Sequence, residues 1–451
     1  MINSKKNPII YGTLLLSFSG LLCRGIGFIY HLFIARKFGE EAMGIFQLTS
    51  PVLILAYSLT CAGFQTGLSK FVASCMGQNQ KQKAHVFFYW GCFIALFFSL
   101  IYSFLIYHFS EPIASIILGE KKCAPLLRIF AFSFPFSSMH SCINGYFYGT
   151  KNTKLPAITQ IAEQLVRVGS VIFLYTLFTS SDQTPSIAIT CFGIVLGEMA
   201  SCIFSFSYYN FACRPYSLSS LHTSNIGESS FFSIPGQLLA FSFPLTLNRV
   251  IVNLLQSYET ILLPAALKKY GYSSHVTLSI YGVLTGMAMS FVLFPSTFVN
   301  SFSVLLLPKV SETQSKGDNS NLKLTIRKAI LFCLILGFFC TLFFFFGGNL
   351  CGTLFFNSTL AGHFIKTLSF LCPFLYLHNT LNSVLNGLKK TNETLFINLF
   401  SLLIRLLTIL FIVPYKGMYA YLYGFLLSEI ISSLLCFYFL RKFIIIKKEY
   451  T

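Results

Sequence analysis

The chain carries a series of apolar runs, each long enough to cross a bilayer, along almost all of its 451 residues. The hydrocarbon core offers the backbone no hydrogen-bond partners, so a spanning run of about 20 residues has to form a helix. The runs lie near residues 9–35, 45–69, 84–108, 125–148, 155–178, 185–211, 236–260, 278–305, 329–347, 364–386, 394–414 and 418–440. They predict an all-α polytopic membrane protein with about 12 transmembrane helices.

The composition agrees with this class, because 55% of the residues are hydrophobic and only 10% are charged. The net charge of +18 raises nucleic acid as an alternative partner, but the basic residues form short clusters between apolar runs and no continuous face. We therefore expect membrane lipids, and no nucleic acid, among the partners.

The predicted loops differ in charge between the two sides of the bundle. One side collects most of the lysines, from Lys5 near the N-terminus to Lys448 near the C-terminus. Cytoplasmic loops carry such an excess. Since an even number of crossings puts both termini on one side, the sequence predicts that the N and C termini are cytoplasmic.

An internal repeat divides the chain. The pattern Pro-Phe-x3-His-x3-Asn-x4-Gly-x-Lys-x-Thr-x13-Arg begins at Pro135 and again at Pro373, an offset of 238. A second pattern, Gly-x4-Glu-x2-Ser, begins at Gly193 and again at Gly424. The repeat predicts two pseudo-symmetric six-helix lobes that enter the membrane in the same sense, and transporters built from such repeats place the substrate site between them.

The longest polar connection sets the expected domain boundaries. We predict an N-lobe of helices 1 to 6 at residues 1–213, a cytoplasmic linker at 214–235, and a C-lobe of helices 7 to 12 at 236–451.

A charge lies near the middle of the first predicted helix. At 100° per residue, Ser17, Gly20, Arg24, Gly27 and His31 share one narrow arc, and bulky aliphatic residues cover the opposite side. A charge inside a membrane is costly, so it is expected to face a partner, a cavity or the substrate.

Helix 7 holds the corresponding place in the second half and repeats this polar face. The residues on its arc are Ser242, Thr246, Arg249, Asn253, Gln256 and Thr260. Arg249 is the rough counterpart of Arg24, and two inward arginines would create a cationic cavity suited to phosphate oxygens. The alternative is that each arginine pairs with an acid or with helix-end carbonyls and stabilises the bundle. No acid lies three or four residues from either one, which favours the substrate.

Other ionisable residues favour structural roles. Glu163 lies four residues before Arg167, which predicts a self-neutralising pair. Repetition suggests the same for His140, His378, Glu198 and Glu429. A histidine can also relay protons, so ion coupling through these two histidines stays open. Glu259, toward the outer end of helix 7, is a further candidate for ion coupling, and pairing with Lys268 or Lys269 is the alternative.

No catalytic, cofactor-binding or metal-binding pattern is present in the sequence, since GxSxG, Walker A, HExxH and EF-hand motifs are absent. We expect neither an enzyme nor a cofactor.

The stretch GYFYGTKNTKLPAITQIAEQLVRV at 145–168 resembles the signature of the stage V sporulation protein B family of polysaccharide-biosynthesis membrane proteins. GFIYHLFIARKFGEEAMGIFQL at 27–48 is similar to the same family, and shorter matches follow in order along essentially the whole chain. The family belongs to the multidrug/oligosaccharidyl-lipid/polysaccharide (MOP) exporter superfamily, with lipid II flippases and multidrug and toxin extrusion (MATE) antiporters. The resemblance implies a V-shaped, two-lobed MATE-like fold and alternating access.

Two departures from the family pattern bear on the substrate. The family commonly has an arginine just before the GYF stretch, where this chain has Asn144. Several relatives also have two additional C-terminal helices that form a groove for the lipid tail, whereas this sequence stops after its twelfth predicted helix. The expectation is therefore a lipid-linked oligosaccharide, of which lipid II is one example.

The resemblance implies a flippase of the bacterial plasma membrane that translocates an undecaprenyl-diphosphate-linked cell-wall precursor and serves spore cortex peptidoglycan. Proteins of cell-wall synthesis are expected partners. The expected cavity residues are Arg24, Arg249, His31, Asn253 and Gln256, with the two arginines on the diphosphate. The expected gate residues, at the outer end of helix 1, are Arg36 and Glu41.

Two other functions are alternatives. A cation-coupled multidrug antiporter matches the count of 12 helices but requires acids, not arginines, on the inner faces. A non-transporting scaffold of a cell-wall synthesis complex would keep the signature without using the cavity charges.

Overall fold

The computed structural model describes residues 8–180, 185–212, 228–315 and 319–449, and every secondary-structure element in these ranges is helical. The chain packs into two compact units. Unit 1 comprises Met1–Gly27 and Leu48–Ile261, and unit 2 comprises Phe28–Gln47 and Leu262–Thr451. Two helices, α1 (Pro8–Leu48) and α10 (Glu228–Tyr270), therefore contribute one part to each unit.

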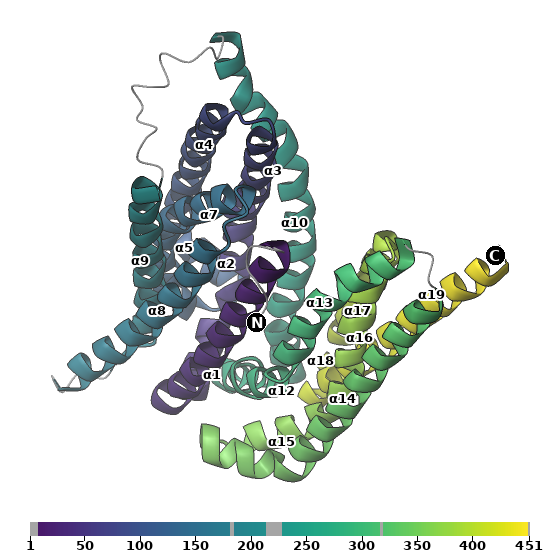
Figure 1. Ribbon diagram of the computed structural model, residues 1–451. Coiled ribbons are helices and arrows are strands. Elements are labelled where there is room, and N and C mark those ends of the chain that lie inside the picture. The colour runs from purple at the N-terminus through teal and green to yellow at the C-terminus, as the bar shows by residue number, and fades with distance from the viewer. Residues whose placement is uncertain (1–7, 181–184, 213–227, 316–318, 450–451) are drawn as a thin grey trace. The chain divides into compact units, whose positions relative to one another are not determined.

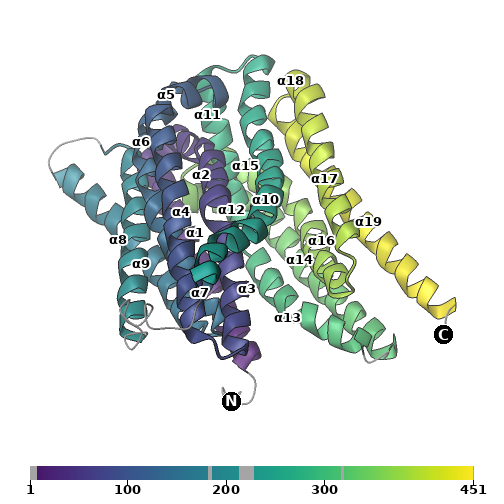
Figure 2. The same cartoon turned by 90° about the horizontal axis from the view of Figure 1, so that it is seen from above.

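Unit 1 is a helical bundle in which α7 packs against α3, α4 and α9, and α8 packs against α9 (Figures 1 and 2). Besides the first part of α1 and of α10, its elements are α2 (Ser50–Tyr57), η1 (Ser58–Ala62), α3 (Gly63–Gly77), α4 (Lys81–His108), α5 (Ser110–Pro112), η2 (Ile113–Ile117), η3 (Lys121–Cys123), α6 (Ala124–Ala131), α7 (Ser133–Gly149), α8 (Lys154–Ser180) and α9 (Ala188–Ala212).

Unit 2 is a second bundle, in which α16 packs against α13, α14 and α19, and α17 packs against α19 (Figure 1). Besides its parts of α1 and α10, its elements are α11 (Ser274–Gly282), η5 (Val283–Ala288), α12 (Met289–Leu293), α13 (Ser296–Ser315), α14 (Asn319–Phe356), α15 (Thr359–Leu368), η6 (Ser369–Leu371), α16 (Cys372–Gly387), α17 (Thr391–Phe411), α18 (Val413–Lys416) and α19 (Met418–Glu449).

Ten helical segments in the described ranges are long and apolar enough to cross a membrane. One of them, Leu14–Gly77, overlaps the first two predicted runs, and nine further runs each overlap a segment of their own. The run at 125–148 corresponds to α6 and α7, which have only 8 and 17 residues. The predicted all-α membrane class is confirmed. The side of the membrane on which the termini lie stays a prediction.

The packing units differ from the predicted lobes. Residues 28–47, expected in the N-lobe, pack with unit 2, and residues 236–261, expected in the C-lobe, pack with unit 1. The helices α1 and α10 have 41 and 43 residues, more than one membrane crossing needs, and α1 is kinked at Gly39, where φ is 83° and ψ is 178°. Most of the predicted linker lies outside the described residues, and its residues 228–235 are helical. The six-plus-six division stays a prediction.

The backbone carries the signature of the sequence repeat. Lys151 and Lys389, which are 238 residues apart, both adopt a positive φ, of 61° and 62°. Gly119 and Asn357 keep the same offset and have φ values of 68° and 53°. Left-handed residues are uncommon outside glycine. Two such pairs at one offset show that the loops of the two copies turn in the same way.

Glycines allow helices within unit 2 to approach closely. A Cβ atom at Gly44 would lie 2.0 Å from the Leu278 carbonyl oxygen, and one at Gly282 would lie 2.2 Å from the Glu40 carbonyl oxygen and 2.5 Å from the Gly44 nitrogen. Two glycines at equivalent positions of the repeat therefore pack directly on each other, so neither site can accept a side chain without displacing backbone.

Candidate functional site

One face of α1 packs against α8 in unit 1. The Ser19 hydroxyl lies 3.4 Å from Gln160 Oε1, and the Cys23 thiol donates to the Gln160 carbonyl oxygen at 3.4 Å. A Cβ atom at Gly27 would lie 3.3 Å from the Gln164 amide nitrogen. The small residues of α1 thus provide the contact with α8, which is a structural role for part of the face that the sequence analysis assigned to the cavity.

Arg24 lies next to this contact but does not take part in it. Its side chain is exposed, and it makes no hydrogen bond or ion pair with any residue that the structure describes. A Cβ atom at either Gly20 or Gly25 would have no neighbour within 4 Å. Arg24 therefore keeps its charge available on an uncrowded stretch of an apolar helix.

Arg249 has the structural partners that the alternative interpretation foresaw. Its guanidinium donates to the Ala62 carbonyl oxygen at 3.3 Å and to the Thr66 hydroxyl at 3.2 Å. Ala62 ends η1, a π-helical turn, and such turns rearrange the regular backbone hydrogen bonds of a helix. The side chain is still exposed, so these contacts fix its direction without burying the charge.

The polar arc of α10 continues along the same neighbour. Asn253 donates to the Ser58 hydroxyl at 2.5 Å. A Cβ atom at Gly63 would lie 1.8 Å from the Thr246 hydroxyl oxygen. Gln256, one turn further along, is exposed. The arc thus belongs to unit 1 with Arg24, although the sequence analysis expected the two arginines to come from different lobes.

The remaining expected residues of helix 1 belong to unit 2. His31 is half-buried, and its Nδ1 atom has no hydrogen-bond partner among the described residues. Arg36 donates to the Phe355 carbonyl oxygen at 2.6 Å and to the Leu354 carbonyl oxygen. These are among the last carbonyls of α14, which lack partners within the helix. Arg36 therefore stabilises a helix C-terminus, and its role as a gate stays a prediction.

Two acids near the end of α1 also make contacts within unit 2. Glu41 lies 3.2 Å from His275 Nε2. Glu40, which the sequence analysis did not single out, accepts hydrogen bonds from Ser279 at 2.6 Å and Ser358 at 2.5 Å. The sequence around Glu40 did not predict this role, because the two serines that it contacts come from distant parts of the chain. Glu259 is buried on α10, and its proposed ion coupling stays untested.

A buried polar network recurs in both units. In unit 2, His378 Nδ1 lies 2.8 Å from Glu429 Oε2, and Asn382 Nδ2 lies 3.0 Å from His378 Nε2. In unit 1, Asn144 contacts His140 at 2.9 Å, but Glu198 Oε2 lies 3.9 Å from His140 Nδ1. The two copies share residues and order but differ in how tightly the carboxylate holds the histidine.

Unit 1 adds a second acid to this network. Ligand atoms of His140, Glu163 and Glu198 lie within 4.8 Å of one another, close enough to share one ion. Glu163 is already paired with Arg167, which confirms the predicted self-neutralising pair. Because Arg167 neutralises part of the charge of Glu163, the cluster attracts a cation less strongly than two free carboxylates would.

Comparison with known proteins places this architecture in a family. A family model described as polysaccharide biosynthesis protein matches residues 9–314. Stage V sporulation protein B of Bacillus subtilis (strain 168) is 28% identical over 405 residues, which are 89% of this chain and 77% of the relative. Lipid II flippase MurJ of the same organism is 21% identical over 345 residues, 73% of this chain and 63% of the relative.

Solved structures share the fold. An inward-facing multidrug resistance MATE family transporter of the MOP superfamily aligns with a TM-score of 0.71 at 14% identity, covering 97% of this chain and 99% of that one. A MOP superfamily transporter from Pyrococcus furiosus, described as having a binding pocket of reverse polarity, aligns with a TM-score of 0.64 at 16% identity, covering 96% and 95%.

The helical fold and these relatives define a multi-pass membrane transporter of the flippase and exporter type, consistent with the bacterial plasma membrane. Those relatives whose names state an activity are a flippase and transporters, not enzymes. The chain belongs to the polysaccharide biosynthesis protein family, whose model matches well over half of its length.

Proposed function

We propose that this transporter flips an undecaprenyl-diphosphate-linked cell-wall precursor across the membrane by alternating access. The observation that carries the proposal is Arg24, an exposed arginine without a partner among the described residues, on an apolar helix. An uncompensated charge at this depth is expensive unless a ligand or water meets it. A diphosphate would supply two acceptor groups for the guanidinium fork.

Arg249 complements Arg24 in this proposal. Its hydrogen bonds to Ala62 and Thr66 hold the guanidinium in place before the substrate arrives, which lowers the entropic cost of binding. Asn253 and Gln256 extend the same polar arc, and His31 offers a ring nitrogen from the next part of α1. Arg36 and Glu41 are proposed gate residues, and Glu259 is proposed to take part in ion coupling.

The relatives support a role in cell-wall synthesis. One is named a lipid II flippase and two are named sporulation proteins. We infer a lipid-linked glycan as substrate and a contribution to spore cortex peptidoglycan, with proteins of cell-wall synthesis as partners. The membrane potential, negative inside, favours outward movement of the anionic diphosphate, and this bias is smaller if the arginines travel with the substrate, because they neutralise its charge.

A cation-coupled exporter is the second candidate, favoured by the half-buried acids Glu163 and Glu198 in unit 1. Such an exporter would use these carboxylates for its coupling ion.

Reconstitution separates these functions. The purified protein is placed in vesicles that hold a fluorescent undecaprenyl-diphosphate glycan, and the fraction reached by an external quencher is followed over time. We expect translocation that empty vesicles do not show. Absence of translocation together with cation-dependent drug export would favour the second candidate, and absence of both would favour a scaffold.

A further inference from the structure

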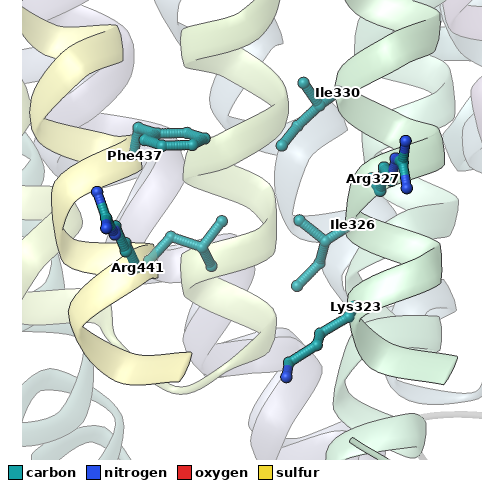
Figure 3. Close-up of a pocket in the computed structure, with 7 residues that line it drawn as sticks. Lys323, Ile326, Arg327, Ile330, Phe437 and Arg441 are labelled. Carbon is teal, nitrogen blue, oxygen red and sulfur yellow. The ribbon is translucent and has the colours of Figure 1, made fainter. Parts of the chain in front are cut away.

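A pocket of about 470 Å³ lies between α14 and α19 within unit 2. Both helices pack against α16. Figure 3 shows Ile326 and Ile330 on one side and Phe437 on the other pointing toward each other, with Lys323 at one end of the gap. The full lining is Lys323, Ile326, Arg327, Ile330, Phe437, Leu440 and Arg441. The walls are almost wholly apolar, because the guanidinium groups of Arg327 and Arg441 point away from the gap and only the Lys323 amine reaches toward its end (Figure 3).

The internal repeat supplies a comparison for this pocket. The offset of 238 residues carries α4 onto α14 and matches His85 with Lys323 and Phe88 with Ile326. The shorter offset of the Gly-x4-Glu-x2-Ser pattern, from Gly193 to Gly424, matches Tyr209 of α9 with Leu440 of α19. The contact between α4 and α9 in unit 1 is therefore equivalent to the contact between α14 and α19 in unit 2, and we call each of these contacts a seam. Both α4 and α9 pack with α7 and α6.

Aromatic side chains close the seam in unit 1. His85 Nδ1 lies 2.7 Å from the Tyr209 hydroxyl, and the rings of Phe88 and Tyr209 lie 4.3 Å apart. The Tyr146 hydroxyl lies 3.3 Å from His85 Nε2. All four side chains are buried in the core of the unit. In the first copy of the repeat, rings therefore fill this seam, and their polar atoms form hydrogen bonds with one another.

The second copy replaces every member of that cluster with a smaller or a cationic residue. Ile326 and Leu440 stand where Phe88 and Tyr209 stand in unit 1, and Val384 stands where Tyr146 does. Lys323 replaces the buried histidine. Removal of three rings leaves a space that the remaining side chains do not fill.

The charges at this pocket are not neutralised by neighbouring acids. Lys323, Arg327 and Arg441 form no ion pair with any residue that the structure describes. The sequence of α14 contains no acid, and Glu429, the acid of α19 whose side chain is described, is bonded to His378. All three cations are exposed.

The cations also lie at the boundary of the membrane-spanning segments. Lys323 and Arg327 are in the first turns of the segment Ser320–Phe356, and Arg441 is next to the last residue of Met418–Lys442. An apolar slot that opens beside cations at this depth matches a lipid with an anionic headgroup, because the acyl chain and the phosphate meet the two kinds of lining at once.

We propose that the pocket between α14 and α19 is a binding site for one acidic phospholipid. An acyl chain occupies the slot lined by Ile326, Ile330 and Phe437, and the phosphate lies at the end of the slot that Lys323 approaches. The guanidinium groups of Arg327 and Arg441 point away from the slot in Figure 3 and attract the headgroup from the two flanking helices. This site lies within unit 2 and is separate from the proposed substrate residues Arg24 and Arg249, so it does not depend on the proposed function.

The test measures lipid retention by native mass spectrometry after purification from vesicles of phosphatidylglycerol and phosphatidylcholine in equal amounts. We expect one phosphatidylglycerol to be retained in preference. The variant Lys323→Gln, Arg327→Gln, Arg441→Gln should lose that preference by roughly fivefold for each cation removed. The matched control, Lys328→Gln with Lys442→Gln, removes two neighbouring exposed cations that do not line the pocket and should keep it.

A second variant tests the slot independently of charge. Ile326→Phe with Leu440→Tyr restores the residues that seal the unit 1 seam, and it should lower retention while all cations stay in place. Thermal unfolding and gel filtration identify a misfolded variant, in which case the charge variant decides alone. Equal retention by the charge variant and the control overturns the proposal. Retention of undecaprenyl phosphate but not of phosphatidylglycerol would also overturn the proposal and would identify the polyprenyl lipid as the occupant. A dimer that the Ile326→Phe, Leu440→Tyr variant disrupts would overturn it as well and would identify a second copy of the chain as the occupant.

Discussion

The Arg249 guanidinium donates a hydrogen bond to the Ala62 carbonyl oxygen at 3.3 Å, at the end of the π-helical turn η1. The second bond, to Thr66, leaves Arg249 held by one neighbouring segment, whereas Arg24 has no such restraint in the described structure. The sequence pattern predicts the same role for the two arginines, but their contacts in the structure differ. One is fixed by the bundle, and the other is available to a ligand.

This difference predicts opposite stability effects. Arg249→Gln should lower the stability of the folded protein by about 1–3 kcal/mol, because it removes two hydrogen bonds from a charged donor. Arg24→Gln should leave stability within about 0.5 kcal/mol of wild type or raise it, since no contact is lost. Thermal unfolding in detergent measures both. A larger loss for Arg24→Gln would contradict the assignment of roles.

Thr66→Val provides a finer probe of the same contact. It keeps the shape of the side chain but removes the acceptor for Arg249, and it should cost about 1 kcal/mol. In the Arg249→Gln background the same substitution should cost markedly less, because the partner is already absent. Additive effects in this double-mutant cycle would show that the two side chains do not interact.

The contact between the repeat-related glycines predicts a strong steric effect. Gly44→Ala places a Cβ atom 2.0 Å from the Leu278 carbonyl oxygen, so the helices have to separate, and we expect a loss of about 1–3 kcal/mol. Gly20→Ala, on the same helix but with nothing within 4 Å, is the matched control and should be neutral or slightly stabilising. The measurement is the thermal unfolding midpoint of each variant. Equal midpoints for the two variants would refute the close contact at Gly44.

The two buried networks should respond unequally to removal of their acid. Glu429→Ala leaves His378 without its partner at 2.8 Å and should destabilise the protein by about 1–3 kcal/mol. Glu198→Ala removes an oxygen that lies 3.9 Å from His140 and is not a hydrogen bond, so its effect should be smaller. The order of the unfolding midpoints is the readout, and the reverse order would contradict it.

Arg36 should act on the end of α14. Arg36→Ala removes the donor to the carbonyls of Leu354 and Phe355, and the expected cost is about 1 kcal/mol. Hydrogen exchange of the last turn of α14 should rise, with no change in the first turns of that helix. Unchanged exchange there would favour the proposed gate over the capping role.

The sequence predicts the helical membrane class and the repeat well, because apolar length and identities at a fixed offset need no tertiary information. The repeat also predicts that Lys151 and Lys389 share one backbone conformation, although the positive sign of φ comes from the structure. The pair of Glu163 and Arg167 was predictable because helix geometry alone brings residues four apart together.

Contacts between distant segments were not predictable from the pattern. Ser58 and Ala62 gave no sign that they would meet Asn253 and Arg249, since both partners are 187 or more residues away. The pocket between α14 and α19 was not predicted either. In the sequence, Lys323 and Arg441 look like ordinary cations at the ends of membrane-spanning helices, and only the packing of α14 and α19 brings them to the same pocket.

The most direct test of the account is the flipping rate of fluorescent undecaprenyl-diphosphate glycan in vesicles that contain wild type, Arg24→Gln, Arg24→Lys or Lys121→Gln. Lys121 is an exposed lysine of η3 and serves as the matched charge control. Loss of a charge-assisted bond of about 1.5–3 kcal/mol predicts a rate roughly ten- to a hundredfold lower for Arg24→Gln, with Arg24→Lys intermediate and Lys121→Gln unchanged. Wild-type flipping by a stably folded Arg24→Gln protein would contradict the account.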